Sequence, residues 1–197
     1  MNLNIQINKI VELYQKGQLE EAKNAVSRLI KTNSNIALLH NLLGAINNNL
    51  NNFKSAKLSF KKAIKIDTNY ADAFSNLGTV LIELNESEDA HKNLLKAIQL
   101  NPKQIEAYIS LGKLCRKFMY FDQEVEHYHK ALEIDPNSMI INSNLASVYR
   151  VQGNIIEAKK ILKKIINLNP NAYRAYNSLG SISIENGDKD NAISYFK

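Results

Sequence analysis

Cysteine is almost absent from this sequence, and so are long apolar runs. Cys115 is the one cysteine in 197 residues, so no internal disulfide framework can hold the fold. No apolar run approaches the roughly eighteen residues that a membrane-spanning helix requires. Residues 1–5 also lack the basic segment and apolar core of a secretory signal. We therefore expect a cytoplasmic protein that does not contact a membrane.

Glycine and proline are also scarce, and every one of them falls on one of three positions in a 34-residue period. The first series is Gly44, Gly78, Gly112 and Gly180, with Ala146 in the remaining position. The second is Gly17, Gly153 and Gly187, with Asn51, Asn85 and Met119 between them. The prolines are Pro102, Pro136 and Pro170, and Ser34 and Thr68 hold the two preceding positions. Self-similarity at a fixed period of this length indicates a repeat architecture.

The three series accept different substitutes because each has a different structural role. The first lies in mid-helix, where glycine lowers helix propensity, so we expect it to permit close contact with a neighbouring helix. The second ends a helix, where a left-handed residue is needed and asparagine is the best substitute for glycine. Met119 does not fit this role. Each proline follows a second helix and biases the residue before it away from helical geometry.

Apolar residues between these positions recur at helical spacing and define two helices per period. In one period Phe74, Leu77 and Leu81 mark the first helix, and Ala90 and Leu94 mark the second. Short connections make the two helices antiparallel neighbours. A weaker unit occupies residues 1–36, and the repeat array occupies 37–197. Its units are 37–70, 71–104, 105–138, 139–172 and the incomplete 173–197.

This pattern resembles the tetratricopeptide repeat, a hairpin of two helices with a known motif. The motif reads Phe74-x2-Leu77-Gly78-x2-Leu81, then Ala90-x3-Leu94 and Pro102. The resemblance implies an all-α fold, a right-handed α-solenoid of antiparallel helix pairs with about five and a half to six repeats. Its concave groove would bind a partner.

The sequence departs from the repeat motif at several positions. Asn47 and Ser183 replace an aromatic residue, and Glu124 replaces a small alanine that lets the two helices touch. We therefore expect a looser helix pair in residues 105–138. The chain also stops at Lys197 inside the second helix of its last unit, whereas solenoids normally close with a capping element. We expect the sequence to be the N-terminal part of a longer protein.

The sequence contains no constellation typical of a catalytic, cofactor or metal site. His127 and His129 diverge by about 200° on a helix, so they cannot share one metal ion. No phosphate loop, nucleophile elbow or glycine-rich dinucleotide turn is present. Cys115 lies on an apolar stripe with Leu111 and Phe118, which indicates a buried structural thiol. We expect no cofactor, no metal and no active site within residues 1–197.

The candidate site is the groove that the first helices line in similar proteins. Asn76 and Asn144 partly match the asparagine ladder in the repeat arm of O-linked N-acetylglucosamine transferases, and amides and hydroxyls can pair with the backbone of an extended peptide. The alternative is that such residues only bridge adjacent repeats. The candidate groove residues are Asn41, Asn76, Ser110, Lys113, Arg116, Lys117, Asn144, Arg150, Asn177 and Ser178, and the wider lining includes Ser143, Ser147 and Arg174.

The charge distribution leaves two interpretations open. The formal net charge is +6, and four of the groove candidates are basic: Lys113, Arg116, Lys117 and Arg150. They could hold an acidic segment or a terminal carboxylate, or they could form an ordinary solvated face. Many other lysines fall on second helices. Nucleic acid is not expected, because it usually needs a continuous basic stripe with stacking aromatics.

Two functions remain open at this stage. The first is a non-catalytic scaffold that binds an extended peptide or partner segment. It is favoured because the residues present serve only helix stacking and surface display. The second is the substrate-recruiting arm of a longer enzyme, since bacterial chains that look like this one often continue into a sulfotransferase or glycosyltransferase domain. The sequence beyond Lys197 would distinguish them.

Overall fold

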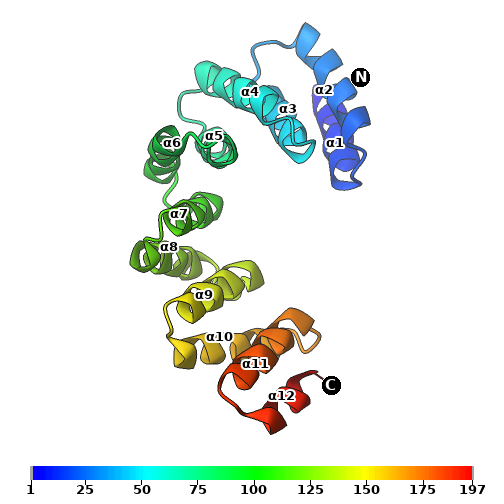
Figure 1. Ribbon diagram of the computed structural model, residues 1–197. Coiled ribbons are helices and arrows are strands. Elements are labelled where there is room, and N and C mark those ends of the chain that lie inside the picture. The colour runs from blue at the N-terminus through cyan, green and yellow to red at the C-terminus, as the bar shows by residue number, and fades with distance from the viewer. Residues whose placement is uncertain (1, 197) are drawn as a thin grey trace. The chain divides into compact units, whose positions relative to one another are not determined.

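The chain is helical throughout, and the computed structural model describes residues 2–196 (Figure 1). Over this range it contains twelve helices and no strand. The helices are α1 (Leu3–Gln15), α2 (Leu19–Thr32), α3 (Ala37–Asn49), α4 (Phe53–Ile66), α5 (Ala71–Glu83), α6 (Ser87–Leu100), α7 (Ile105–Lys117), α8 (Phe121–Ile134), α9 (Met139–Val151), α10 (Ile155–Leu168), α11 (Tyr173–Glu185) and α12 (Lys189–Phe196). The prediction of an all-α solenoid is confirmed.

Helix lengths repeat along the chain because the sequence signals repeat. Each odd-numbered helix has 13 residues. The even-numbered helices from α2 to α10 have 14 residues, and α12 has 8. From α3 onward the odd-numbered helices begin at Ala37, Ala71, Ile105, Met139 and Tyr173, which are the residues at which the aligned units begin.

The mid-helix glycines lie where the two helices of a hairpin come closest. The pairs are Gly44–Phe60, Gly78–Leu94, Gly112–Tyr128 and Gly180–Phe196, and in each a Cβ on the glycine would lie 2.5 Å from the partner side chain. A real Cβ essentially never lies so close, so the expected close contact is confirmed. In the α9–α10 hairpin the equivalent residues are Ala146 and Leu162, which belong to one buried cluster.

Every odd-numbered helix ends in the same turn. Its left-handed residues are Gly17 (φ 75°), Asn51 (58°), Asn85 (61°), Met119 (61°), Gly153 (78°) and Gly187 (74°). In the α7–α8 turn, the Met119 N–H donates to the Arg116 carbonyl and the Tyr120 N–H donates to the Cys115 carbonyl, each at 3.0 Å. This is the Schellman pairing that closes a helix C-terminus. The predicted role of this series is confirmed, and Met119 takes the same conformation despite its side chain.

The prolines follow the even-numbered helices, as the sequence predicts. Pro102, Pro136 and Pro170 come two residues after α6, α8 and α10 end. The residues before them leave the helical region: Asn101 has φ −137° and ψ 96°, Asp135 has −128° and 87°, and Asn169 has −142° and 99°. The proline ring therefore reinforces the end of these three second helices at a fixed point of the repeat.

The chain divides into two compact units, Met1–Ser110 and Leu111–Lys197, with the boundary inside α7. In the first unit, side chains from α1, α2 and α3 form one buried cluster that includes Ile10, Val26 and Leu39. In the second, side chains from α9, α10 and α11 form another that includes Leu162 and Leu179. In each unit the core therefore runs between neighbouring hairpins, and the polar residues of the odd-numbered helices are left at the surface or between helices.

Candidate functional site

Hydrogen bonds join the side chains of successive odd-numbered helices in the first unit. The pairs are Asn49 Nδ2 with Tyr14 Oη (2.8 Å), Asn76 Nδ2 with Asn41 Oδ1 (3.1 Å), and Thr79 Oγ1 with Ser110 Oγ (2.8 Å). Three predicted groove residues, Asn41, Asn76 and Ser110, thus lie in contacts between repeats. The odd-numbered helices of this unit carry polar links where they lie side by side.

Asn41 and Asn76 act as a bridge between hairpins. Asn76 donates to Asn41, and the Asn41 amide donates in turn to the Tyr70 hydroxyl at 3.3 Å. This is the bridging role that the sequence left open as the alternative to peptide binding. The Asn41 side chain is therefore close enough to Asn76 to pair with it.

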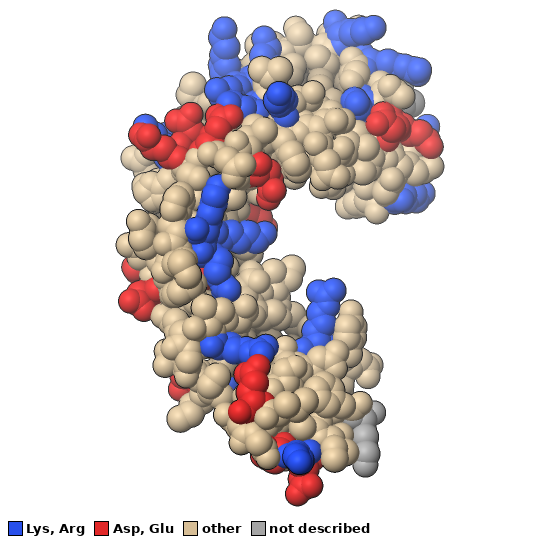
Figure 2. All heavy atoms as spheres, viewed as in Figure 1, with Lys and Arg blue, Asp and Glu red and all other residues tan. Residues whose placement is uncertain are grey.

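The basic residues of the second unit divide into two groups. Figure 2 shows basic side chains over α7 and α9. Arg116 pairs with Glu124, and Arg150 pairs with Glu185. Lys113 and Lys117 are exposed on α7. The two arginines of the predicted basic stretch therefore already have carboxylate partners within the protein, whereas Lys113 has none among residues 2–196.

Glu124 holds Arg116 in place from within the α7–α8 hairpin. The Glu124 side chain is fully buried, and Arg116 Nε donates to both of its oxygens, at 2.8 and 2.7 Å. Arg116 also donates from a terminal nitrogen to the Ser147 hydroxyl of α9 at 3.4 Å. We expected Glu124 to loosen this helix pair; instead the carboxylate is buried with a cation, and its partner reaches the next odd-numbered helix.

The candidate surface has free polar groups where α9 and α11 face each other. Two adjoining pockets of about 360 and 280 Å³ lie there, and both are lined by Ser143, Arg174 and Ala175. Asn144 lines the larger pocket, and Ser178 lines the smaller one. Within the described chain, the Ser143 and Asn144 side chains have no hydrogen-bond partner. These pockets can therefore supply unpaired donors and acceptors to a ligand.

Arg174 lies between the two pockets and carries an available positive charge. Its guanidinium lies 5.9 Å from the centre of the Tyr173 ring. No carboxylate between residues 2 and 196 forms an ion pair with it. Of the other predicted residues on α11, Ser178 donates to the Arg174 carbonyl at 2.9 Å, and Asn177 is exposed.

Sequence reasoning missed the apolar rim of the larger pocket. Met139, Ile140 and Tyr173 line it and have exposed fractions of 38%, 67% and 66%. Met139 and Tyr173 hold the same repeat position, one period apart, at the first residue of α9 and of α11. Comparing the exposed positions of successive units, rather than only the polar ones, would have singled them out.

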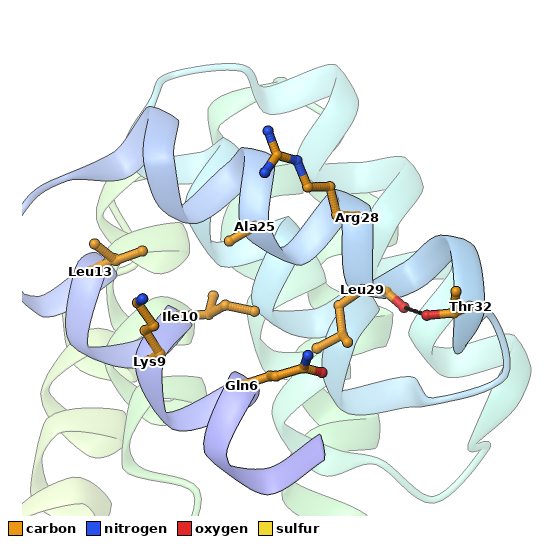
Figure 3. A pocket seen from close by; sticks show the side chains of 8 residues that line it. All are labelled: Gln6, Lys9, Ile10, Leu13, Ala25, Arg28, Leu29 and Thr32. Carbon is orange, nitrogen blue, oxygen red and sulfur yellow. Dashed lines mark hydrogen bonds between the residues drawn. The ribbon is translucent and has the colours of Figure 1, made fainter. Parts of the chain in front are cut away.

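Another pocket lies at the first hairpin, between α1 and α2 (Figure 3). Its volume is about 340 Å³; Ile10, Leu13 and Leu29 line it, together with the cationic side chains of Lys9 and Arg28. Thr32, at its edge, donates to the Leu29 carbonyl at 3.2 Å. None of the predicted groove residues lines this pocket.

Neither a metal-ligand cluster nor a membrane-spanning helix is found in the described part of the chain. No cluster of three or more His, Cys, Asp or Glu side chains suited to a metal ion occurs in residues 2–196. Burial, with the nearby negative charges of Glu124 and Glu126, raises the pKa of the Cys115 thiol, which disfavours the reactive thiolate. None of the described helices combines the length and apolar character needed to cross a bilayer.

Comparison with protein families gives one consistent result. Family models described as tetratricopeptide repeat match residues 37–70 and 105–138, residues 59–92, and residues 143–197. Together these matches cover more than half of the chain. No curated protein matches the sequence.

Solved structures similar to this chain include three proteins of the same architecture. PilF of Pseudomonas aeruginosa has a TM-score of 0.84 at 22% identity, with 98% of this chain and 87% of PilF covered. MamA has a TM-score of 0.70 at 25% identity, with coverages of 88% and 98%. YrrB, described as a TPR protein with an unusual peptide-binding site, has a TM-score of 0.64 at 25% identity, with coverages of 88% and 89%.

Proposed function

We propose that this chain, which belongs to the tetratricopeptide repeat family, is a non-catalytic scaffold that holds an extended segment of a partner protein between α9 and α11. The observation that carries the proposal is the pair of adjoining pockets there, lined by Ser143, Asn144, Arg174 and Ser178. Proteins of this family bind protein or peptide partners, and YrrB, at 25% identity, is described as having a peptide-binding site.

Unpaired amide and hydroxyl groups suit an extended peptide. Such a segment exposes backbone N–H and C=O groups, and each must find a partner when water is displaced. Asn144 can both donate and accept, and so can the Ser143 hydroxyl. These contacts recognise a backbone with little regard to its side chains, so sequence preference must come from the rest of the pocket.

The rest of the pocket favours a segment that carries both a carboxylate and an apolar side chain. Arg174 offers a planar, doubly donating cation that suits a carboxylate. The exposed rim of Met139, Ile140 and Tyr173 offers apolar contact next to it. Lys113, which has no carboxylate partner in the described chain, adds positive charge to the same unit.

The polar residues of the first unit are less suited to this role. Asn41 and Asn76 already bond to each other, and Ser110 bonds to Thr79. A peptide that used these groups would have to replace interactions that join the repeats. We therefore place binding on the α9–α11 surface.

The experiment is a selection of random peptides displayed on phage against the whole chain, followed by affinity measurements on the selected peptides. The test variant is Asn144→Ala/Arg174→Ala, and the matched control is Asn167→Ala/Lys163→Ala, which removes one amide and one cation from the exposed surface of α10. We expect peptides rich in acidic and apolar residues to lose at least about tenfold in affinity with the test variant, the loss of roughly 1.4 kcal/mol, and to bind the control normally. Equal affinity for both variants would reject this site.

A further inference from the structure

The smaller pocket between α9 and α11 brings hydroxyl and guanidinium groups together. Its polar lining is Ser143, Ser147 and Arg150 of α9, with Arg174 and Ser178 of α11. No acidic side chain of the described chain lines this pocket or the larger one beside it. Its volume of about 280 Å³ lies just below the roughly 300–1,000 Å³ of pockets that hold drug-sized ligands. The pocket therefore suits one small, negatively charged group.

The helices that line the pocket contain few carboxylates, and other side chains engage them. Helices α9, α10 and α11 together carry six basic residues and two acidic ones. Of the two, Glu157 pairs with Lys160 at 3.5 Å, and Glu185 pairs with Arg150. The positive charge of Arg174 is therefore left for a ligand.

The pocket offers more hydrogen-bond donors than the oxygens of one carboxylate can accept. The Ser143 hydroxyl has no partner in the described chain, and Ser147 accepts from Arg116 at 3.4 Å, so its own proton remains available. Ser178 donates to the Arg174 carbonyl and offers no further proton. The Arg174 guanidinium adds a fork of N–H donors. A phosphate monoester fits this set better, because it carries three strong acceptor oxygens and a charge of about −1.5 to −2 at neutral pH.

Among the chain's own repeats, this pair of helices alone combines hydroxyls with cations at these positions. The same five positions read Ile7, Val11, Tyr14, Leu38 and Leu42 between α1 and α3; Asn41, Ala45, Asn48, Asp72 and Asn76 between α3 and α5; Ser75, Thr79, Ile82, Glu106 and Ser110 between α5 and α7; and Ile109, Lys113, Arg116, Ile140 and Asn144 between α7 and α9. All of these helices form the same repeat without the combination. Repeat stacking therefore does not account for it.

We propose that this pocket binds a phosphorylated serine or threonine of the partner segment. The inference rests on the peptide site proposed above and names the group that the site selects. Arg174, which lines both pockets, pairs with the phosphoryl group, and Ser143 and Ser147 donate to its oxygens. An apolar side chain next to the phosphorylated residue enters the larger pocket, where Met139 and Tyr173 are exposed.

The arrangement favours a phosphorylated side chain over a nucleic acid. A nucleic acid is held through many successive phosphates, usually along a basic groove with stacking aromatic rings. Here the available donors converge on one pocket, and the cations towards α7, Arg116 and Arg150, are paired with carboxylates. A single monoester, which carries more charge than a phosphodiester, matches one pocket of this kind.

Two peptide libraries test the selection. Each has random flanks around a fixed central residue, which is phosphoserine in one library and glutamate in the other. Both are enriched on the whole chain, and each enriched phosphopeptide is compared with its Glu and Ser counterparts. We expect the phosphopeptides to bind at least about tenfold more tightly than their Glu counterparts.

The outcomes separate this inference from the proposed function. Equal affinity for phosphopeptides and their Glu counterparts, or enrichment from the glutamate library alone, would overturn the inference and leave the peptide site standing. No enrichment from either library would reject both. Displacement of the phosphopeptides by an equal concentration of a short oligothymidylate would also overturn the inference, because the ligand would then be a phosphodiester backbone.

A pair of double variants locates the phosphoryl group. Ser143→Ala/Ser147→Ala removes two hydroxyl donors and leaves every charge in place, and the matched control, Ser181→Ala/Ser194→Ala, removes two hydroxyls that line neither pocket. We expect the first variant to bind phosphopeptides about five- to tenfold more weakly, with less than about a twofold change for their Glu counterparts. The control should bind both normally, and the melting temperature should be kept because Ser143 and Ser147 are exposed. Equal losses for both kinds of peptide, or no loss in the folded variant, would contradict the proposal.

Discussion

Gly112 lies directly against Tyr128, and a Cβ on Gly112 would come within 2.5 Å of the tyrosine ring. Tyr128 is 2% exposed, so the ring has little room to move away. We expect Gly112→Ala to destabilise the protein by about 1 kcal/mol, because overpacking by roughly 1–3 kcal/mol outweighs a helix-propensity gain of about 1 kcal/mol. Urea unfolding of both proteins gives the difference.

The same substitution should have the opposite effect beside a smaller partner. Gly112→Ala in a Tyr128→Leu background recreates the Ala146–Leu162 pair of the fourth array unit. There we expect the alanine to be neutral or stabilising, since the ring is gone and the propensity gain remains. An equal loss in both backgrounds would mean that the close contact with Tyr128 is not what requires glycine.

Glu124 occupies a position that is alanine in every other unit: Ala22, Ala56, Ala90, Ala158 and Ala192. Glu124→Ala leaves Arg116 without its carboxylate. Breaking a buried pair costs about 3–5 kcal/mol, but Arg116 is 34% exposed and can reach water, so we expect a loss of about 2 kcal/mol. Arg116→Ile/Glu124→Ala recreates the Ile82–Ala90 pair and should recover most of that loss. In thermal and chemical unfolding, the unmodified chain should be the most stable, the double variant second and Glu124→Ala the least stable. A double variant less stable than Glu124→Ala would contradict this ranking.

We predict that Asn76→Ala and Asn144→Ala lower the free energy of unfolding by different amounts. Asn76→Ala removes the bond to Asn41 and should cost about 0.5–1.5 kcal/mol of stability. Asn144→Ala removes no bond within the described chain and should change stability by less than about 0.5 kcal/mol. The free energy of unfolding of each single variant distinguishes a bridging asparagine from a ligand-facing one. Equal losses would remove the basis for assigning them different roles.

Cys115 should react slowly with thiol reagents. Burial raises the pKa of its thiol, and the charges of Glu124 and Glu126 raise it further, so little thiolate exists near neutral pH. We expect alkylation to accelerate only at a higher pH than for an unperturbed thiol, whose pKa is about 8.5. Glu124→Ala should shift this profile to lower pH, because one negative neighbour is lost. A rapid, pH-independent reaction near neutrality would contradict the assignment.

The fold could be predicted from the sequence because glycine carries two distinct signals in it. Gly112 faces a large side chain, whereas Gly153 has a left-handed backbone and no atom close to its Cβ position. Their spacing alone separated these roles, and Asn51 and Asn85 identified the second one. Met119 adopts the same left-handed conformation although methionine disfavours it, so the whole hairpin sets the geometry of the turn.

The candidate site could be predicted only as a set of helices. The repeat pattern predicted the positions of Arg116 and Arg150 but not their partners, because Glu124 and Glu185 come close only after the hairpins have formed and stacked. Met139 and Tyr173 were missed because only polar side chains of the first helices were considered as groove candidates. The bacterial source, the cytoplasmic location and the likeness to transferase arms stay predictions.

Side chains that bond between neighbouring odd-numbered helices lie about one repeat period apart in the sequence. The bonded pairs Asn41–Asn76 and Arg150–Glu185 are each 35 positions apart, and Thr79–Ser110 and Arg116–Ser147 are each 31 apart. Duplicating or removing a whole period would therefore disturb only the pairs at the junction where the change is made, and it would leave the pairs between more distant hairpins intact. Chain length in such a protein is a property that can change in steps of 34 residues, so the reach of the binding surface can evolve independently of the contacts that keep each hairpin folded.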